Sequence, residues 1–540
     1  MTASRVSLVF ATGLCIVAAG ACTQNSGSDG RNSGNSGQLN GFLTEKTGGM
    51  QANAWSGTSL STAKQLTSAL PAAPHSRALR DLQFSVMVSQ LTPPREDGSP
   101  PPSLFARKVD RLAAMGEGES LNEVVRTAGD YDDPAIATTV TDAMMMAGER
   151  DGACVVADQH ALTEPFAQRA KAACLLAKGD RDGALSQVAA LRGRDPSFAA
   201  LVEGAAGTKT ATVPPGLTPD GPTMIVLFLA HLAPPSPLLS TTQPPLIRAL
   251  VGQPTLPMAT RIDIAERGEA LAIIDAARLA DLYVDALHQG APLPPAMERR
   301  ARLVQAARDA ANPPEIVAAV RAVYGETRGS PLFPTIARAS AVALVNLPAK
   351  PEYADLAQEA IRGFLLLGDK RLTKAWTKLA LQAAYNNARA LNALDRLMPL
   401  IQIAGIDDAR RLAPEDVNRW YEVMRQDDPR AAPLRGNVLL ALFRGVGFDL
   451  PPRSTDLPEA PPPDARLLMP SAATLQALQA AGTAHRRAEA SLLASDAIGE
   501  TPLGNLHPAA LGIIVRALSD AGEGSAARLF AIEAAIAHGL

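Results

Sequence analysis

The sequence is short of aromatic and charged residues, and each shortage narrows the range of partners. Phenylalanine, tryptophan and tyrosine make up 4% of the 540 residues, so platforms on which bases or sugar rings stack are poorly supplied. Charged residues make up 19%, below the ~25% of typical soluble proteins, and the formal net charge is −3. Because phosphate backbones are bound by concentrated Lys/Arg surfaces, this composition argues against nucleic acid as the main partner.

The sequence also lacks the common catalytic and cofactor-binding patterns. It contains no nucleophile elbow, zinc-protease helix, dinucleotide-binding glycine pattern or phosphate-binding loop. The seven histidines are scattered, and none pairs with another at the spacing of metal ligands, so no metal site is predicted. We therefore expect a protein that is not an enzyme, has no cofactor and has no evident small-molecule substrate.

The N-terminus has the pattern of a segment for export from a bacterial cytoplasm. Arg5 precedes the apolar stretch Val6–Ala19, which is too short for a comfortable membrane-spanning helix of ~20 residues. The next residues, Ala19-Gly20-Ala21-Cys22, resemble the lipobox of bacterial lipoproteins, although leucine is usual at the position of Ala19. The resemblance implies that residues 1–21 are a signal peptide and that Cys22 carries fatty acyl chains such as palmitate.

Two alternatives stay open at this site. An ordinary signal peptidase would cut the same bond and release a secreted protein without lipid, or the segment is retained as an uncleaved anchor. Thr23 follows Cys22 where an aspartate would mark retention in the inner membrane, so the resemblance favours an outer-membrane lipoprotein that faces the periplasm. Residues 22–58 are then expected to form a flexible tether, because Gly/Ser/Asn-rich chain cannot bury a core.

The rest of the chain reads as helices broken by proline and glycine, which predicts an all-α fold. Leu356, Ala360, Phe364 and Leu367, for example, recur at the spacing of one helix face. The length allows roughly three domains, and Pro-rich stretches mark the expected boundaries. The expected regions are an N-terminal helical region 59–210, a Pro-rich connection with one apolar helix 211–255, a central helical region 256–450, a Pro-rich linker 451–465 and C-terminal helical hairpins 466–540.

A short turn motif recurs between predicted helices. It runs from Gly148 to Ala153, from Gly179-Asp180 to Ala184, and from Gly522 to Ala527, with a looser copy at Gly368-Asp369. The glycine can end one helix in a left-handed conformation, the acidic residue can cap the next, and the alanine permits a close helix crossing. The motif resembles the internal turn of tetratricopeptide (TPR) repeats, which implies a TPR-like α-solenoid. A generic helical bundle is the alternative.

Cys154 and Cys174 are the two cysteines of the predicted folded body. The midpoint between them lies in a plausible turn that ends at Pro165, so two antiparallel helices would place both at the same height. Neighbouring alanines would permit the close approach that a disulfide needs, and an oxidising periplasm would permit the bond. We therefore predict a Cys154–Cys174 disulfide, with a pair of buried free thiols as the alternative.

The densest run of positive charge contains Arg299, Arg300 and Arg302. A solvated helix face is the default interpretation, and a binding strip for an acidic peptide or an anionic glycan is the alternative. Trp376 and Trp420 are expected to anchor the core rather than to form exposed binding hot spots.

These features together predict a non-catalytic, membrane-anchored periplasmic lipoprotein. It would act as a protein–protein interaction scaffold or assembly factor, with envelope proteins as its partners and the membrane contacted through the lipid. The alternative is a superhelical module of a peptidoglycan-active protein, similar to lytic transglycosylases. In that case Glu298, Glu315 or Glu500 is the candidate catalytic acid.

Overall fold

The computed structural model describes residues 41–309, 312–385, 387–406, 412–448, 450 and 455–540. The expected signal peptide and the lipidation site Cys22 lie outside these residues. Within the described ranges all regular structure is helical, and the only β-type pairings are three isolated bridges. The prediction of an all-α fold is therefore confirmed.

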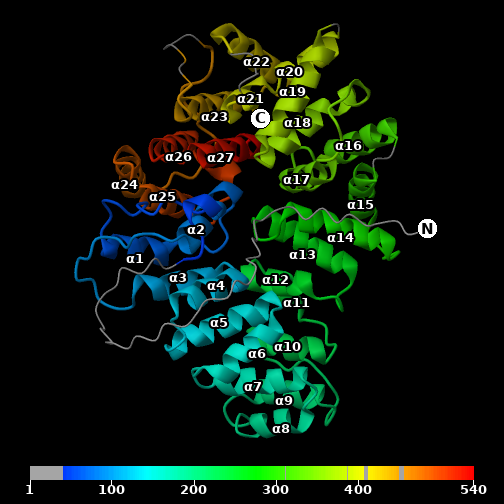
Figure 1. Ribbon diagram of the computed structural model, residues 1–540. Coiled ribbons are helices and arrows are strands. Elements are labelled where there is room, and N and C mark those ends of the chain that lie inside the picture. The colour runs from blue at the N-terminus through cyan, green and yellow to red at the C-terminus, as the bar shows by residue number, and fades with distance from the viewer. Residues whose placement is uncertain (1–40, 310–311, 386, 407–411, 449, 451–454) are drawn as a thin grey trace, which may run out of the picture.

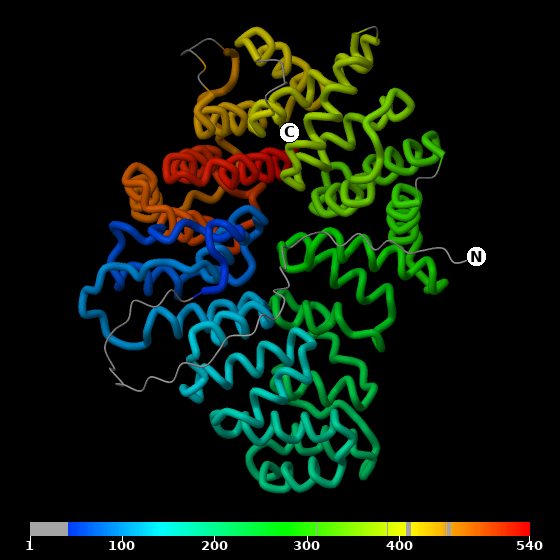
Figure 2. The backbone as a smooth tube through the Cα atoms, in the orientation of Figure 1, coloured from blue at the N-terminus to red at the C-terminus, as the bar shows by residue number. Residues whose placement is uncertain are grey.

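The helices follow one another around a closed ring (Figures 1 and 2). The chain starts in the blue helices, descends to α8 and α9 at the bottom of the view, and returns upward through the green helices. This first part comprises η1 Glu45–Thr47, α1 Leu60–Ala69, α2 Arg77–Val88, α3 Leu104–Ala114, α4 Gly118–Ala128, α5 Pro134–Ala147, α6 Arg150–Gln159, α7 Phe166–Ala177, α8 Arg181–Ala189, α9 Pro196–Ala205, α10 Gly221–Leu229, α11 Ser236–Leu239, α12 Pro244–Gly252, α13 Met258–Ala270 and α14 Ala276–His288.

The second part of the ring climbs to the top of the view and then turns back to its start. The red helices at the C-terminal end lie beside the blue N-terminal helices in both views, and α27 contacts α2, α18 and α21. This part comprises α15 Pro295–Arg308, α16 Pro313–Thr327, α17 Phe333–Leu344, η2 Pro351–Leu356, α18 Ala357–Leu366, α19 Lys370–Ala384, α20 Ala388–Asp395, α21 Met398–Ala404, α22 Pro414–Asp427, α23 Ala432–Gly445, α24 Ala472–Thr483, α25 Arg487–Ile498, η3 Leu503–Asn505, α26 Pro508–Asp520 and α27 Gly524–Ala537.

The recurring glycines lie between paired helices, as the turn motif predicts. Gly148, Gly179, Gly368 and Gly522 have φ values of 89°, 85°, 69° and 94°, a region in which a side chain would be strained. The alanines of the motif, Ala153, Ala184 and Ala527, are fully buried where the paired helices cross.

Only part of the expected capping is present at these turns. Asp180 and Asp369 accept hydrogen bonds from the backbone N–H groups of Gly183 and Leu372, at 2.9 and 2.8 Å. Glu149 and Glu523 make no such cap, and the Glu523 carboxylate instead pairs with Arg487 on α25 at 2.7 Å. Glutamate has one more methylene than aspartate, which lets it reach a neighbouring helix instead of its own first turn.

The tether was predicted to extend too far along the chain. Within residues 41–58, Met50 and Trp55 are buried, and the backbone N–H of Ala488 donates to the carbonyl oxygen of Ala54 at 3.0 Å. These residues are therefore packed against the C-terminal part of the ring. Despite the Gly/Ser/Asn content of the expected tether, its two large apolar side chains, Met50 and Trp55, anchor this part of it to the core.

The Pro-rich segments are also packed parts of the body. The connection 211–255 holds three helices, α10, α11 and α12, where one was expected. In the described part of 451–465, Leu457 is buried, and the side-chain amide of Asn437 donates to the carbonyl oxygen of Pro458 at 2.9 Å. Buried apolar residues form one continuous core from Met50 to Ile536, so proline here shapes connections without separating cores. Among the described helices, none is both long and apolar enough to cross a membrane.

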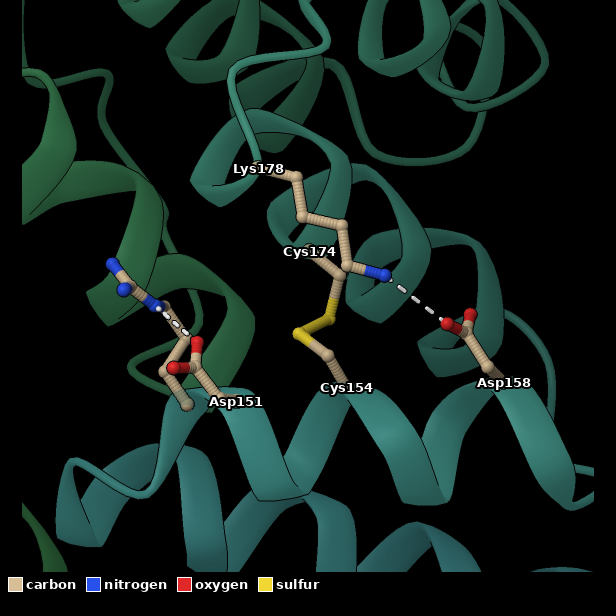
Figure 3. The surroundings of a disulfide bond; sticks show 6 residues. Asp151, Cys154, Asp158, Cys174 and Lys178 are labelled. Atoms are coloured by element: carbon tan, nitrogen blue, oxygen red, sulfur yellow. Dashed lines mark hydrogen bonds and ion pairs between the residues drawn. A yellow bond between two sulfur atoms is a disulfide. The ribbon is translucent and has the colours of Figure 1, made fainter.

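The two cysteines of the body lie together (Figure 3). Cys154 on α6 and Cys174 on α7 are joined as a disulfide, with their Cα atoms 5.7 Å apart. The intervening turn lies between Gln159 and Phe166, around the predicted midpoint. On one side of the bond, the Lys178 ammonium pairs with the Asp158 carboxylate at 3.2 Å, so α6 and α7 are also joined by an ion pair.

Reducing this disulfide should lower the free energy of unfolding by about 3 kcal/mol, because the bond closes a loop that is otherwise free in the unfolded chain. Chemical denaturation with and without reductant measures the change, and the Cys154→Ala/Cys174→Ala variant, which reductant cannot affect, is the control. Tryptic peptides of the wild type that have the same masses with and without reductant would contradict the pairing.

Candidate functional site

The predicted basic strip on α15 is not present as a free surface. Arg299 pairs with Glu326 at 2.8 Å, and Arg302 pairs with Glu298 at 2.5 Å. Arg300 is 9% exposed and points into the core, where it pairs with the Glu266 carboxylate at 2.7 Å. Each arginine of the strip thus has its own glutamate partner, and Arg300 does not belong to the exposed face. The pairing of Arg299 and Arg302 favours the default interpretation of a solvated helix face.

A cluster of buried charges lies where the ring closes, and we call it the closure cluster: Ser76, Arg77, Glu269, Arg338 and Glu533. The Glu269 side chain is fully buried at the end of α13. Both of its oxygens accept hydrogen bonds from Arg338 on α17, at 2.5 and 2.8 Å. Arg77, the first residue of α2, contacts the same carboxylate at 3.3 Å. One carboxylate therefore joins three helices that are distant in sequence.

Glu533 on α27 extends this cluster to the C-terminal end of the ring. Its two oxygens accept hydrogen bonds from the Ser76 hydroxyl at 2.6 Å and from the Arg77 backbone N–H at 3.1 Å. The Ser76 oxygen also accepts from the backbone N–H of Leu79 and so caps α2. The start of α2 is consequently held by α27 on one side and by α13 and α17 on the other.

The two carboxylates of the closure cluster respond differently to burial. Burial raises the pKa of Glu269, but the charges and hydrogen bonds of Arg338, followed by the charge of Arg77, outweigh it, so this pKa lies below its ordinary value. Burial raises the pKa of Glu533, and the hydrogen bond from Ser76 offsets the rise only in part. Glu269 is therefore the firmly ionised member of the cluster.

A cavity of about 850 Å³ lies beside the closure cluster, and we call it the central cavity. Its walls come from the start of α2, the end of α13, the turn before α17, and from α17, α18, α22, α23 and the end of α27. Six arginine side chains line it, against three carboxylate side chains, those of Glu269, Asp427 and Glu533. The arginines are Arg77, Arg328, Arg338, Arg362, Arg396 and Arg435.

The arginines of the cavity wall differ in how far the protein neutralises them. Arg338 and Arg77 pair with Glu269, and Arg396 pairs with both oxygens of Asp427. Arg435 approaches Asp428 only at 3.6 Å. Within the described part of the chain, the side chains of Arg328 and Arg362 form no ion pair or hydrogen bond.

The positions singled out in the sequence fall largely outside this cavity. Trp376 is fully buried in the core, whereas Trp420, also buried, forms part of the cavity wall. Glu298 lies on the surface of α15, Glu315 lies in the first turn of α16, and Glu500 is exposed after α25. The structure therefore does not bring these three acids together.

The charged residues of the closure cluster and of the central cavity were not predicted from the sequence. A signal for them was present: Arg338 and Glu533 are each the only charge within a helical run that is otherwise apolar, apart from Ser340 in the first, Ile336–Leu344 and Leu529–Ala537. Such residues are almost never fully buried unless they are paired. A lone charge on an apolar helix therefore predicts a partner elsewhere in the chain, although it does not say which one.

Comparison of the chain with protein-family models, with curated proteins and with solved structures finds no match. The candidate site therefore rests on the geometry of this protein alone, without a related protein for comparison.

Replacing Glu269 by glutamine should destabilise the protein by about 3 kcal/mol or more, because Arg338 would keep a buried charge without its carboxylate partner and Arg77 would retain only the exposed Asp275. Denaturant unfolding followed by circular dichroism measures this. Glu298→Gln is the matched control, since it breaks an exposed pair that is worth ~0–1 kcal/mol.

The difference in unfolding free energy between the wild type and Glu269→Gln should depend on pH. The pKa of Glu269 is depressed, so its contribution is fully present above the ordinary value of 4.5 and is lost as the pH falls through the lower folded-state value. The gap between the wild type and Glu269→Gln should therefore narrow below about pH 4.5. Equal stability of the two proteins at pH 7 would contradict the role of Glu269.

Proposed function

We propose that the protein is a lipid-anchored, non-catalytic binding protein of the bacterial cell envelope. Cys22 would carry the lipid, and the helical body would face the periplasm from the outer membrane. The body would act as an interaction scaffold or assembly factor for envelope proteins. Its helix pairs, joined by glycine turns like those of TPR repeats, would form a closed variant of an α-solenoid.

Two structural features support this proposal. The Cys154–Cys174 pair at disulfide distance suits an oxidising compartment, to which a signal peptide would deliver the chain. The observation that carries the binding function is the central cavity, because a cavity of about 850 Å³ with unpaired arginines in its wall is a place where a partner group can be held.

Labelled palmitate should enter the wild-type protein and not the Cys22→Ala variant, since the thiol of Cys22 is the proposed acceptor. The label is followed by autoradiography of the purified protein, and both proteins are also located by fractionation of inner and outer membranes. Equal labelling of the two proteins would contradict acylation at Cys22. Cleavage without any label would favour the alternative of a secreted protein.

Cross-linking in intact cells followed by affinity purification should recover at least one envelope protein with the wild type. Recovery should fall with Cys22→Ala, because the anchor keeps the body near its membrane-bound partners. Reproducible absence of any envelope partner would contradict the scaffold role. Release of muropeptides from isolated sacculi by the purified protein would instead favour the cell-wall enzyme.

A further inference from the structure

We propose that the central cavity binds an organic anion, and that Arg328 and Arg362 hold its phosphate or carboxylate group. This inference deepens the proposed binding function and rests on it for the premise that the body holds a partner group. It names the chemistry of that group, which neither the N-terminal pattern nor the helical fold specifies.

The wall of the central cavity carries an excess of positive charge. It contains six arginine and three carboxylate side chains, although the whole chain has a formal net charge of −3. The cavity wall is therefore positive in a protein that is negative overall. Walls of low dielectric focus such a field and favour the entry of an anion.

The surroundings of Arg362 on α18 also favour a bound anion. Its side chain is half-buried in the cavity wall without an ion pair or hydrogen bond to the described residues. Its pKa is lowered to about 10, mainly by burial and then by the positive charge of Arg328, with a smaller part from Arg396 and a partial opposing effect of Glu359 and Tyr324. The guanidinium is still protonated at neutral pH, so like charges lie near one another in the cavity wall. A bound anion would relieve this repulsion.

Two arginines of the cavity wall also leave their hydrogen-bond donors unused. The side chains of Arg328 and Arg362 line the cavity and donate to no acceptor among the described residues. A guanidinium N–H can only donate, so these groups need an acceptor that the protein itself does not supply. Phosphate and carboxylate oxygens match the guanidinium fork.

The size and lining of the cavity indicate that the anion has an organic part. Ligand pockets span ~300–1,000 Å³, and the central cavity falls in the upper part of this range, far above the size of a small inorganic ion. Apolar side chains share the wall with the arginines, among them Phe333, Leu366, Trp420 and Met424. These would contact the carbon skeleton while the arginines hold the charged group.

Isothermal titration calorimetry on the purified full-length protein in non-ionic detergent tests the proposal. The probes are inorganic pyrophosphate and citrate, titrated at one ionic strength set with sodium chloride, so that phosphate and carboxylate chemistry are distinguished. At least one probe should bind with 1:1 stoichiometry. Arg362→Gln and Arg328→Gln should each weaken binding about tenfold or more, which corresponds to the loss of one strong charged contact.

Arg299→Gln is the matched control, because Arg299 is an exposed arginine that pairs with Glu326 and does not line the central cavity. It should leave the affinity unchanged within about twofold. Failure of both probes to bind the wild type would overturn the proposal. So would an equal loss of affinity in Arg299→Gln, which would indicate general attraction to positive charge.

Thermal unfolding without added anion separates a binding role of Arg362 from a structural one. Arg362→Gln should raise the melting temperature, because it removes an unpaired charge from a repulsive cluster. A lower melting temperature would show that Arg362 supports the fold and would overturn the proposal. This result is independent of the test for the lipid anchor. Palmitate can label Cys22 although neither anion binds, and the anions can bind to a protein that carries no lipid.

Discussion

The arrangement of the ring depends on the fully buried carboxylate of Glu269, which is held by Arg338 and Arg77. A fully buried charge is tolerated only when its partners are in place, because removing one partner leaves the other charge desolvated and unpaired. Glu269, Arg338 and Arg77 lie on α13, α17 and α2, and Ser76 and Arg77 connect them to Glu533 on α27. These helices therefore fit together in one register, since a displaced register would leave buried charges without partners.

Closure of the ring changes what the helices can offer to a partner. An open array of helix pairs presents a long concave surface, whereas joining its two ends brings residues from both ends into one cavity wall. In this protein that wall belongs to the central cavity and includes residues that close the ring. A protein partner would then be met by the outer helix faces, and a small charged group would be met by the cavity. The sequence suggested only the first of these two possibilities.

The features that could be predicted from the sequence are local ones. The glycine turns and the Cys154–Cys174 pair depend on residues within one helical hairpin, so spacing and helix geometry suffice to place them. The closure cluster joins Ser76 to Glu533 across 457 residues, and no local periodicity encodes such a contact. Arg300 was expected on the exposed strip of α15 and is buried, for a different reason. Arg300 lies three residues after Met297 and four before Val304, which places it on the buried stripe of the helix. The density of charge along the sequence does not show which face of the helix each arginine occupies.

Arg338 and Arg362 show why two arginines in one cavity wall have different roles. Arg338 is buried with a bidentate carboxylate partner, so its charge is used within the protein and its removal would harm the fold. Arg362 is half-buried beside Arg328 and Arg396 without such a partner, so we expect its charge to cost stability when no anion is bound. Residues that destabilise the empty state are commonly retained where function requires them. The contrast separates the part of the wall that closes the ring from the part that is free to hold an anion.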